Sequence, residues 1–314
     1  MVFLYIAIGL VSFGVFMYLL TIIIVTSILY TKLFVRTSKE KWSRTVSWPD
    51  EELQHMFDEG KLWGEKYDSY RKTLNINSEG FNLVAEYFDF GYDKTVIIIP
   101  GRSESGTYSY YFSEPYRKSG YNVLAIDNRC HGLSDGKYNT LGLKEYKDVL
   151  AWGKLIHDEY HINKIYIHGI CIGSATAIHL LSRENVPSYF VGLTAEGTYS
   201  TFEELFNNQL RKRKKPVFPY TKLVLFLIRL KAGVSLKKNS PINEIDKVKV
   251  PILFLYSKQD SFAKPDKSLE LFNKVTSKKK LVWFDEGEHS HIRIHNMEKY
   301  DNSIIEFLKE NINE

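Results

Sequence analysis

The longest uninterrupted apolar pattern in the chain lies at its N-terminus. No charged residue occurs between Met1 and Thr31, and the run from Val2 to Tyr30 is rich in Ile, Leu, Val and Phe. About 20 apolar residues are enough for a helix to cross a bilayer. A cleaved signal peptide fits poorly, because no basic segment precedes the run and the run is too long. We therefore expect residues 1–31 to form one transmembrane anchor.

Beyond residue 70, short apolar runs alternate with amphipathic stretches. Strands are predicted at 72–76, 82–88, 95–99, 122–126, 164–168, 189–193, 252–256 and 280–284, and helices at 108–118, 143–160, 173–182, from 265 onward and at 297–310. The first two strands flank a Ser-Glu-Gly turn and read as a hairpin. The later strands are continuously apolar and are separated by helices. This pattern predicts an α/β fold with a mostly parallel sheet covered by helices on both faces.

The same pattern divides the chain into three parts. After the anchor, residues 32–70 read as a juxtamembrane linker with one amphipathic helix, which starts at Pro49-Asp50-Glu51-Glu52. Residues 71–314 form the α/β domain, and an insert at about 199–248 interrupts its strand rhythm. The insert holds the basic run 211–215 and the apolar run 223–228. It could dock on anionic lipid, or it could be a solvated turn plus a helix packed on the site.

Charge and cysteine content narrow the possible environment and partners. The basic residues Lys32, Arg36, Lys39, Lys41 and Arg44 follow the anchor, so the positive-inside rule predicts a single-pass cell-membrane protein with its domain on the cytoplasmic side. A single-span protein with a free N-terminus can break this rule, and the opposite orientation stays open. Two cysteines are too few for a disulfide scaffold and fit a reducing compartment. The net charge of +5 and one short basic run do not indicate nucleic-acid binding.

The stretch Gly169-Ile170-Cys171-Ile172-Gly173 carries the clearest chemical signal. It follows a strand-like run and precedes a small-residue helix start, a context typical of a nucleophile elbow. This tight turn crowds its neighbours, which explains the flanking glycines. The central residue is usually Ser, and here it is Cys171. Either Cys171 is the nucleophile, or the site has lost its chemistry.

A nucleophile at the elbow needs a base, and the base needs an orienting acid, in the chain order nucleophile, acid, histidine. Asp260 follows the strand predicted at 252–256, and His289 lies on the loop after the last strand. Both positions suit a site at the carboxyl ends of parallel strands. We therefore expect Cys171, Asp260 and His289 to form a catalytic triad. The alternatives are Glu196 as the acid and His291 or His295 as the base.

A tetrahedral intermediate also needs two backbone N–H donors. One is expected from Ile172, the residue after the nucleophile. The other is expected from the loop Pro100-Gly101-Arg102-Ser103 after the strand at 95–99, with the N–H of Arg102 as the candidate. We expect no cofactor and no metal ion at this site.

Together these motifs resemble the α/β-hydrolase superfamily, most closely its membrane-anchored bacterial members related to the serine aminopeptidase group. The segment 127–136 is similar to the family's D-x-R-x-H-G-x-S-x-G loop, in which His131 would be structural. The acid and histidine segments around Asp260 and His289 also resemble the family. The likeness covers roughly residue 70 to the C-terminus and implies that the insert is the lid. Two departures stand out: Pro100 precedes Gly101 where the family has His, and Cys171 replaces Ser.

The resemblance and the residues together predict a membrane-anchored hydrolase that cleaves an ester, thioester or related acyl bond. A helix N-terminus and a neighbouring histidine favour the thiolate form of a cysteine, so a Cys-His-Asp triad is chemically reasonable. The substrate would be a small-molecule or lipid-like acyl compound. Two alternatives remain: a non-catalytic binding or scaffold protein with the same fold, and an acyltransferase that uses the same thiol. The sequence does not indicate the oligomeric state.

Overall fold

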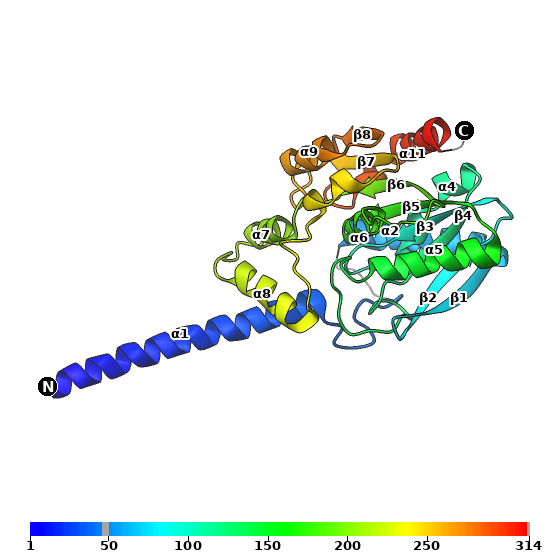
Figure 1. Cartoon of the computed structure of the whole chain (residues 1–314). Helices are drawn as coiled ribbons and strands as arrows, with labels where there is room; N and C mark the ends of the chain where they lie inside the picture. The colour runs from blue at the N-terminus through cyan, green and yellow to red at the C-terminus, as the bar shows by residue number, and fades with distance from the viewer. Residues whose placement is uncertain (46–49, 313–314) are drawn as a thin grey trace.

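The computed structural model describes residues 1–45 and 50–312, and it begins with one long helix that projects from the rest of the chain (Figure 1). Helix α1 spans Val2–Phe34 and is long and apolar enough to cross a membrane. It continues past Thr31, the predicted end of the anchor. Pro49, the predicted start of the next helix, lies outside the described residues. In the described part, α2 spans Glu51–Lys66 and is capped by the Asp50 side chain, which accepts from the N–H of Leu53.

An eight-stranded sheet forms the centre of the molecule, in the order β1-β2-β4-β3-β5-β6-β7-β8. Strands β1 (Arg71–Ser78) and β2 (Phe81–Phe88) form the predicted antiparallel hairpin, and β2 also runs antiparallel to β4. All other neighbours are parallel. The remaining strands are β3 (Lys94–Ile99), β4 (Asn122–Ile126), β5 (Lys164–Ile170), β6 (Phe190–Glu196), β7 (Ile252–Ser257) and β8 (Lys279–Phe284). The predicted mostly parallel sheet is confirmed.

Helices cover both faces of this sheet, as predicted (Figure 1). One face carries α5 (Tyr146–Tyr160), α6 (Ile172–Leu181) and α9 (Pro265–Lys274), whose apolar side chains share one core with the strands. The other face carries α2, α3 (Gly106–Ser109), α4 (Glu114–Lys118) and α11 (Met297–Asn311), and a short helix α10 (Ile292–His295) precedes α11. Two apolar cores on opposite faces explain why the central strands carry apolar side chains on both of their faces.

The prediction of one continuous helix at 108–118 is wrong. The structure has two short helices there, α3 and α4, joined by a 3-10 turn at Tyr110–Phe112. Pro115 lies at the start of α4, where its missing N–H is tolerated, whereas inside one long helix it would remove a backbone hydrogen bond. The apolar periodicity of the segment reflects its burial against the sheet rather than one regular helix.

The chain between α1 and α2 is fastened to the domain over its described part. The Lys41 ammonium donates to backbone carbonyls at the C-terminal end of α1, including that of Val35 at 2.5 Å. Arg44 forms ion pairs with Glu86 at 2.5 Å and with Asp127 at 2.8 Å. Asp127 follows β4 directly, so these contacts tie the base of α1 to the carboxyl edge of the sheet.

The insert contains two helices, α7 (Phe202–Lys212) and α8 (Tyr220–Ala232), that pack beside the C-terminal end of α1 (Figure 1). The rings of Phe34 and Phe202 lie 5.6 Å apart. The apolar cluster that joins α1 to both helices also includes Ile172, the first residue of α6. The insert therefore lies against the turn that carries Cys171 and shares its packing with the apolar N-terminal helix.

Candidate active site

Cys171 occupies a strained turn between β5 and α6, as the elbow motif predicts. Its backbone has φ 53° and ψ −106°, which side-chain-bearing residues rarely adopt. A Cβ atom on Gly169 would lie 2.3 Å from the backbone nitrogen of Ser174, and one on Gly173 would lie 2.0 Å from the carbonyl oxygen of Ile99. Close approach of the neighbouring backbone therefore restricts both flanking positions to glycine. The tight turn that they permit lifts the thiol above the sheet edge.

His289 and Asp260 are in hydrogen-bond contact. His289 Nδ1 lies 2.7 Å from Asp260 Oδ2. The other carboxylate oxygen of Asp260 accepts from the backbone N–H groups of Phe262 and Ala263, both at 2.8 Å. These two bonds fix the carboxylate, which in turn orients the imidazole ring. The predicted acid and base thus lie together.

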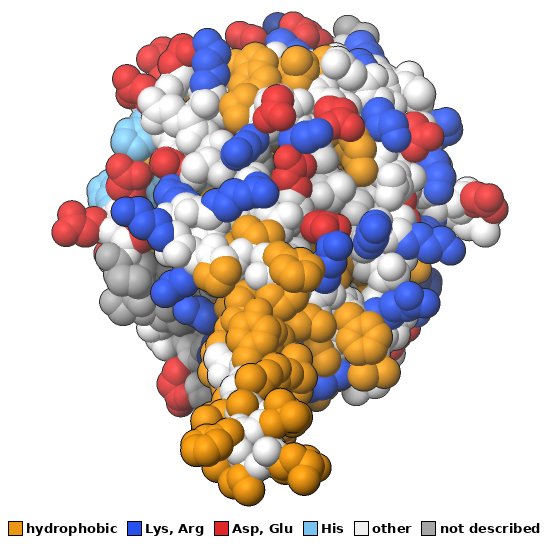
Figure 2. Space-filling view, turned by 90° about the vertical axis from the view of Figure 1, so that its left-hand side faces the viewer, with side chains coloured by type: hydrophobic (Ala, Val, Ile, Leu, Met, Phe, Trp, Pro, Cys, Tyr) orange, Lys and Arg blue, Asp and Glu red, His pale blue; other side chains and the backbone are white. Residues whose placement is uncertain are grey.

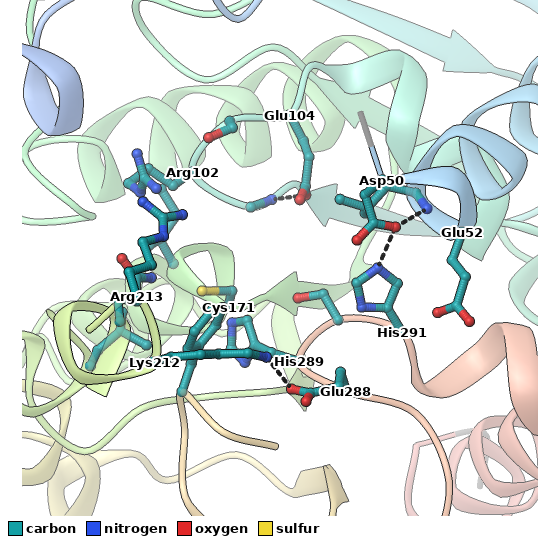
Figure 3. A pocket seen from close by; sticks show the side chains of 18 of the residues that line it. Asp50, Glu52, Arg102, Glu104, Cys171, Lys212, Arg213, Glu288, His289 and His291 are labelled. Atoms are coloured by element: carbon teal, nitrogen blue, oxygen red, sulfur yellow. Dashed lines mark hydrogen bonds and ion pairs between the residues drawn. The ribbon is translucent and has the colours of Figure 1, made fainter. Parts of the chain in front are cut away.

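The second ring nitrogen of His289, Nε2, is buried and accepts or donates no hydrogen bond within residues 1–45 and 50–312. Figure 3 shows the ring beside the Cys171 side chain at the base of the pocket. Burial lowers the pKa of His289, but the negative charge of Asp260 and that of a Cys171 thiolate outweigh this effect and raise it well above the ordinary value. The environment therefore favours an imidazolium next to the sulfur.

The alternative acid and bases do not form such an acid–base pair. The buried carboxylate of Glu196 accepts a hydrogen bond from the hydroxyl of Tyr300. His291 lines the pocket but faces Asp50, at 3.5 Å from its carboxylate. His295, at the end of α10, pairs with Glu52 at 3.0 Å. The geometry brings Asp260 and His289 together rather than any of these alternatives.

The loop after β3 contains the Arg102 N–H that the sequence predicts as a donor. The N–H of Gly101 donates to Glu104 Oε2 at 2.6 Å, whereas the N–H of Arg102 makes no hydrogen bond in the described part of the chain. His131 Nε2 lies 2.5 Å from the carbonyl oxygen of Arg102 and holds this loop. Ile172 is the first residue of α6, where backbone N–H groups have no acceptor within the helix. Both candidate donors are thus available.

Glu104 is a pocket residue that the sequence reasoning missed. Burial raises its pKa to about 7, although the hydrogen bond from the Gly101 N–H and the charge of His289 oppose this rise. No motif marked it, because a Glu three residues beyond a strand-ending glycine has no distinctive spacing. It adds a carboxyl group that titrates near neutrality to the pocket of the thiol.

A cavity of about 420 Å³ opens over Cys171 and His289, a size typical of small-molecule sites (Figure 3). Besides the elbow and Phe262, the cavity is lined by the start of α2, the loop after β3, helix α7 of the insert, and the His289 loop. Lys212 and Arg213, which the sequence suggested as lipid-binding or solvated, reach this cavity. Asp50 and Glu52 do so as well, although their sequence signal was only that of a helix start. Within the described ranges, no group of His, Cys, Asp and Glu is arranged to hold a metal ion.

Comparison with known proteins agrees with this architecture. The family model for the alpha/beta hydrolase fold matches residues 94–239, which include the elbow and the loop after β3. The uncharacterized protein YqkD of Bacillus subtilis (strain 168) is 27% identical over 262 residues, covering 82% of this chain and 85% of the relative. Protein bem46 of Schizosaccharomyces pombe is 27% identical over 198 residues, covering 62% and 60%.

Among solved structures, the Pyrococcus furiosus esterase Pf2001 superposes with a TM-score of 0.65 at 25% identity, covering 79% of this chain and 94% of the esterase. The acylaminoacyl peptidase of Pyrococcus horikoshii, at a TM-score of 0.57 and 19% identity, shares the fold over 77% of this chain and 41% of its own length. This chain has the α/β-hydrolase fold, on which the family model and the structural neighbours agree.

Proposed function

We propose that this chain is a membrane-anchored hydrolase that cleaves an ester, thioester or related acyl bond through Cys171, His289 and Asp260. The observation that carries the proposal is the contact between His289 Nδ1 and Asp260 at 2.7 Å, with the buried Nε2 left unpartnered on the side of the thiol. An imidazole oriented in this way can hold or move a proton at Nε2 only. A residue that had lost its role would not need a fixed carboxylate behind it.

In the first half of the reaction, the Cys171 thiolate attacks the acyl carbon. The carbonyl oxygen gains the negative charge and is stabilised by the N–H groups of Arg102 and Ile172. The bond to the leaving group then breaks, and His289 donates its Nε2 proton to the departing oxygen or sulfur. The products of this half are a thioester on Cys171, the free alcohol or thiol, and a neutral imidazole.

In the second half, His289 removes a proton from water as the water oxygen attacks the thioester carbon. The same two N–H groups stabilise the second oxyanion. The carbon–sulfur bond breaks, the carboxylic acid leaves, and the thiolate–imidazolium pair is restored. Asp260 keeps Nδ1 protonated throughout, so that Nε2 always faces the reacting atoms.

The membrane part of the proposal rests on α1 and its surroundings. Figure 2 views the molecule toward the N-terminal end of α1 and shows an apolar projection with Lys and Arg side chains around its base. Basic residues that directly follow a span favour the cytoplasmic leaflet, so we propose a single pass with the domain in the cytoplasm. Because α7 and α8 pack on α1, the pocket would open close to the lipid surface, which suits amphiphilic acyl substrates.

Two other functions remain as outcomes of the test. If water is excluded and another nucleophile enters, the same thioester would transfer its acyl group to an alcohol or amine. If the thiol does not react, the fold would serve to bind a ligand or partner. The resemblance to the serine aminopeptidase group stays a prediction, because the similar proteins include both an esterase and an acylaminoacyl peptidase.

The test uses the full chain in a non-ionic detergent with p-nitrophenyl acetate and with an acyl thioester. We expect turnover by the wild type and none above background by Cys171→Ala or His289→Ala. Turnover that neither substitution changes would contradict the triad. Product release that accelerates with an added alcohol or amine would identify acyl transfer, and inactivity on every acyl substrate would favour the binding protein.

A further inference from the structure

Most charged side chains around the cavity have a polar or charged partner close by. Lys212 pairs with Glu288 at 3.0 Å, His291 with Asp50 at 3.5 Å, and His295 with Glu52 at 3.0 Å. The Glu104 carboxylate accepts the backbone N–H of Gly101. These contacts give each of these side chains, on the side of the cavity formed by α2 and the His289 loop, a neighbour with which it interacts.

Arg102 and Arg213 are exceptions. Both line the cavity, and neither guanidinium forms a hydrogen bond or an ion pair with any of residues 1–45 and 50–312. Arg102 comes from the loop after β3 and Arg213 caps the C-terminal end of lid helix α7. Figure 3 shows the two side chains reaching toward each other on the side of the pocket away from Asp50 and Glu52, next to Cys171.

The two guanidinium groups approach each other with no carboxylate bonded to either, and they repel each other, although Arg213 is exposed and solvent weakens this repulsion. Burial and the positive charge of Arg213 lower the pKa of Arg102, and the negative charges of a Cys171 thiolate and of Glu104 oppose this effect only in part. Arginine nevertheless stays protonated in proteins, so the repulsion cannot be relieved by loss of a proton. An anion between the two groups would relieve it, and the planar guanidinium is suited to bidentate bonds with carboxylate or phosphate oxygens.

We propose that Arg102 and Arg213 form an anion subsite, and that the natural substrate is an acyl compound carrying a carboxylate or phosphate group. The part of this inference that concerns a substrate rests on the proposed function, whereas anion binding at the subsite does not require turnover. Because the backbone N–H of Arg102 is a candidate oxyanion donor, its side chain starts at the reacting centre. The anionic group would therefore lie within a few bonds of the scissile carbonyl, on the acyl or the leaving-group side.

A matched pair of alkylating reagents tests the subsite at the thiol itself. Iodoacetate and iodoacetamide react with thiolates in the same way and differ mainly in charge. We would measure both rates at Cys171 by peptide mass spectrometry on the full chain in non-ionic detergent, and divide their ratio by that of glutathione. Any change in thiolate content affects both reagents and cancels in this ratio. The variants are Arg213→Gln and, as the control, Arg211→Gln, whose side chain contacts Asn208 and does not line the cavity.

The proposal predicts a normalised ratio of roughly fivefold or more in favour of iodoacetate for the wild type and for Arg211→Gln, given the strength of partly exposed charge pairs. It predicts a drop of about threefold or more in Arg213→Gln. A wild-type ratio equal to that of glutathione, or one that Arg213→Gln leaves unchanged, would overturn the subsite. Slow labelling by both reagents with the ratio still raised would support the subsite and count against the reactive thiol, so the two failures are distinguishable.

Two substrate pairs then separate the sources of the anion. The carboxylate pair is mono-p-nitrophenyl glutarate against p-nitrophenyl pentanoate, and the phosphate pair is 1-oleoyl lysophosphatidic acid against 1-oleoylglycerol. We expect one anionic member to have the higher kcat/KM, and Arg213→Gln to remove that preference while leaving hydrolysis of the neutral member. Hydrolysis of the neutral members with no preference for either anion would overturn the substrate class and leave the proposed function intact.

Discussion

The chain has two cysteines, and their loops are alike in local structure but differ in everything that governs reactivity. Cys130 and Cys171 both have positive φ, 62° and 53°, and both have a histidine nearby. Cys130 Sγ lies 3.7 Å from Nδ1 of His131. A cysteine beside a histidine in a strained turn is therefore present twice, and this pattern alone does not identify a nucleophile.

The difference lies in the surroundings of each pair. Cys130 is fully buried, and burial raises its pKa well above the ordinary value. Both ring nitrogens of His131 face backbone carbonyls, and Trp42 stacks on the ring at 4.6 Å. His289 instead has a carboxylate at one nitrogen, no hydrogen-bond partner among the described residues at the other, and a place in the lining of the cavity. A fixed acid and access to a pocket distinguish the proposed nucleophile from a structural thiol.

Exchanging each cysteine for alanine should give opposite outcomes, and this is the largest expected effect. Cys171→Ala should reduce kcat/KM on the order of 10⁴-fold, because the nucleophile is lost, with little change in the free energy of unfolding. Cys130→Ala should keep kcat/KM within about a factor of 3 while lowering the free energy of unfolding by about 1 kcal/mol, because a buried group is removed. Ester hydrolysis and urea denaturation measure the two quantities. A large loss of activity in Cys130→Ala at unchanged stability would contradict a purely structural role for Cys130.

The histidines extend the comparison. His289→Ala should lower kcat/KM roughly 10³-fold, since proton transfer is lost, and should leave the urea midpoint close to that of the wild type. His131→Ala should instead cost about 2 kcal/mol of unfolding free energy, because a cavity forms and the Arg102 carbonyl loses its partner. Stability and activity are measured on the same preparations. If His131→Ala removed activity without lowering the free energy of unfolding, a purely structural role for the loop that carries His131 would be contradicted.

Asp260→Asn should lower kcat/KM by about 10²-fold, a smaller effect than that of His289→Ala, and should also change its pH dependence. The pKa of His289 is raised, so the imidazolium is present at neutral pH and is lost as pH rises through that pKa. Removing the Asp260 charge lowers the pKa of His289, and the alkaline limb of kcat/KM should therefore move to lower pH. Asp285→Asn is the control, since Asp285 is on the loop that carries His289 but pairs with Lys258 at the surface. Equal limbs in wild type and Asp260→Asn would contradict the coupling.

Local patterns accounted for the fold and for most of the candidate site. The apolar strands, the glycine spacing around Cys171 and the strand-end positions of Asp260 and His289 are all short-range signals, and they predicted the sheet, the elbow and the acid–base contact. Pocket composition is a different kind of property. Glu104, Asp50 and Arg213 meet only because the loop after β3, the start of α2 and the lid converge in space, and no spacing in the sequence records that. The prediction of one helix at 108–118 was wrong for a related reason, because burial on the sheet and Pro115 outweighed the apolar periodicity.

The most direct test of the central claim is to trap the covalent intermediate. The full chain would be mixed with an acyl thioester, quenched in acid within milliseconds to seconds, digested and analysed by mass spectrometry. The account predicts the acyl mass on the peptide that contains Cys171, its release by neutral hydroxylamine, and its absence in Cys171→Ala. An acyl group on any other residue, or hydrolysis that continues in Cys171→Ala without an intermediate, would contradict it.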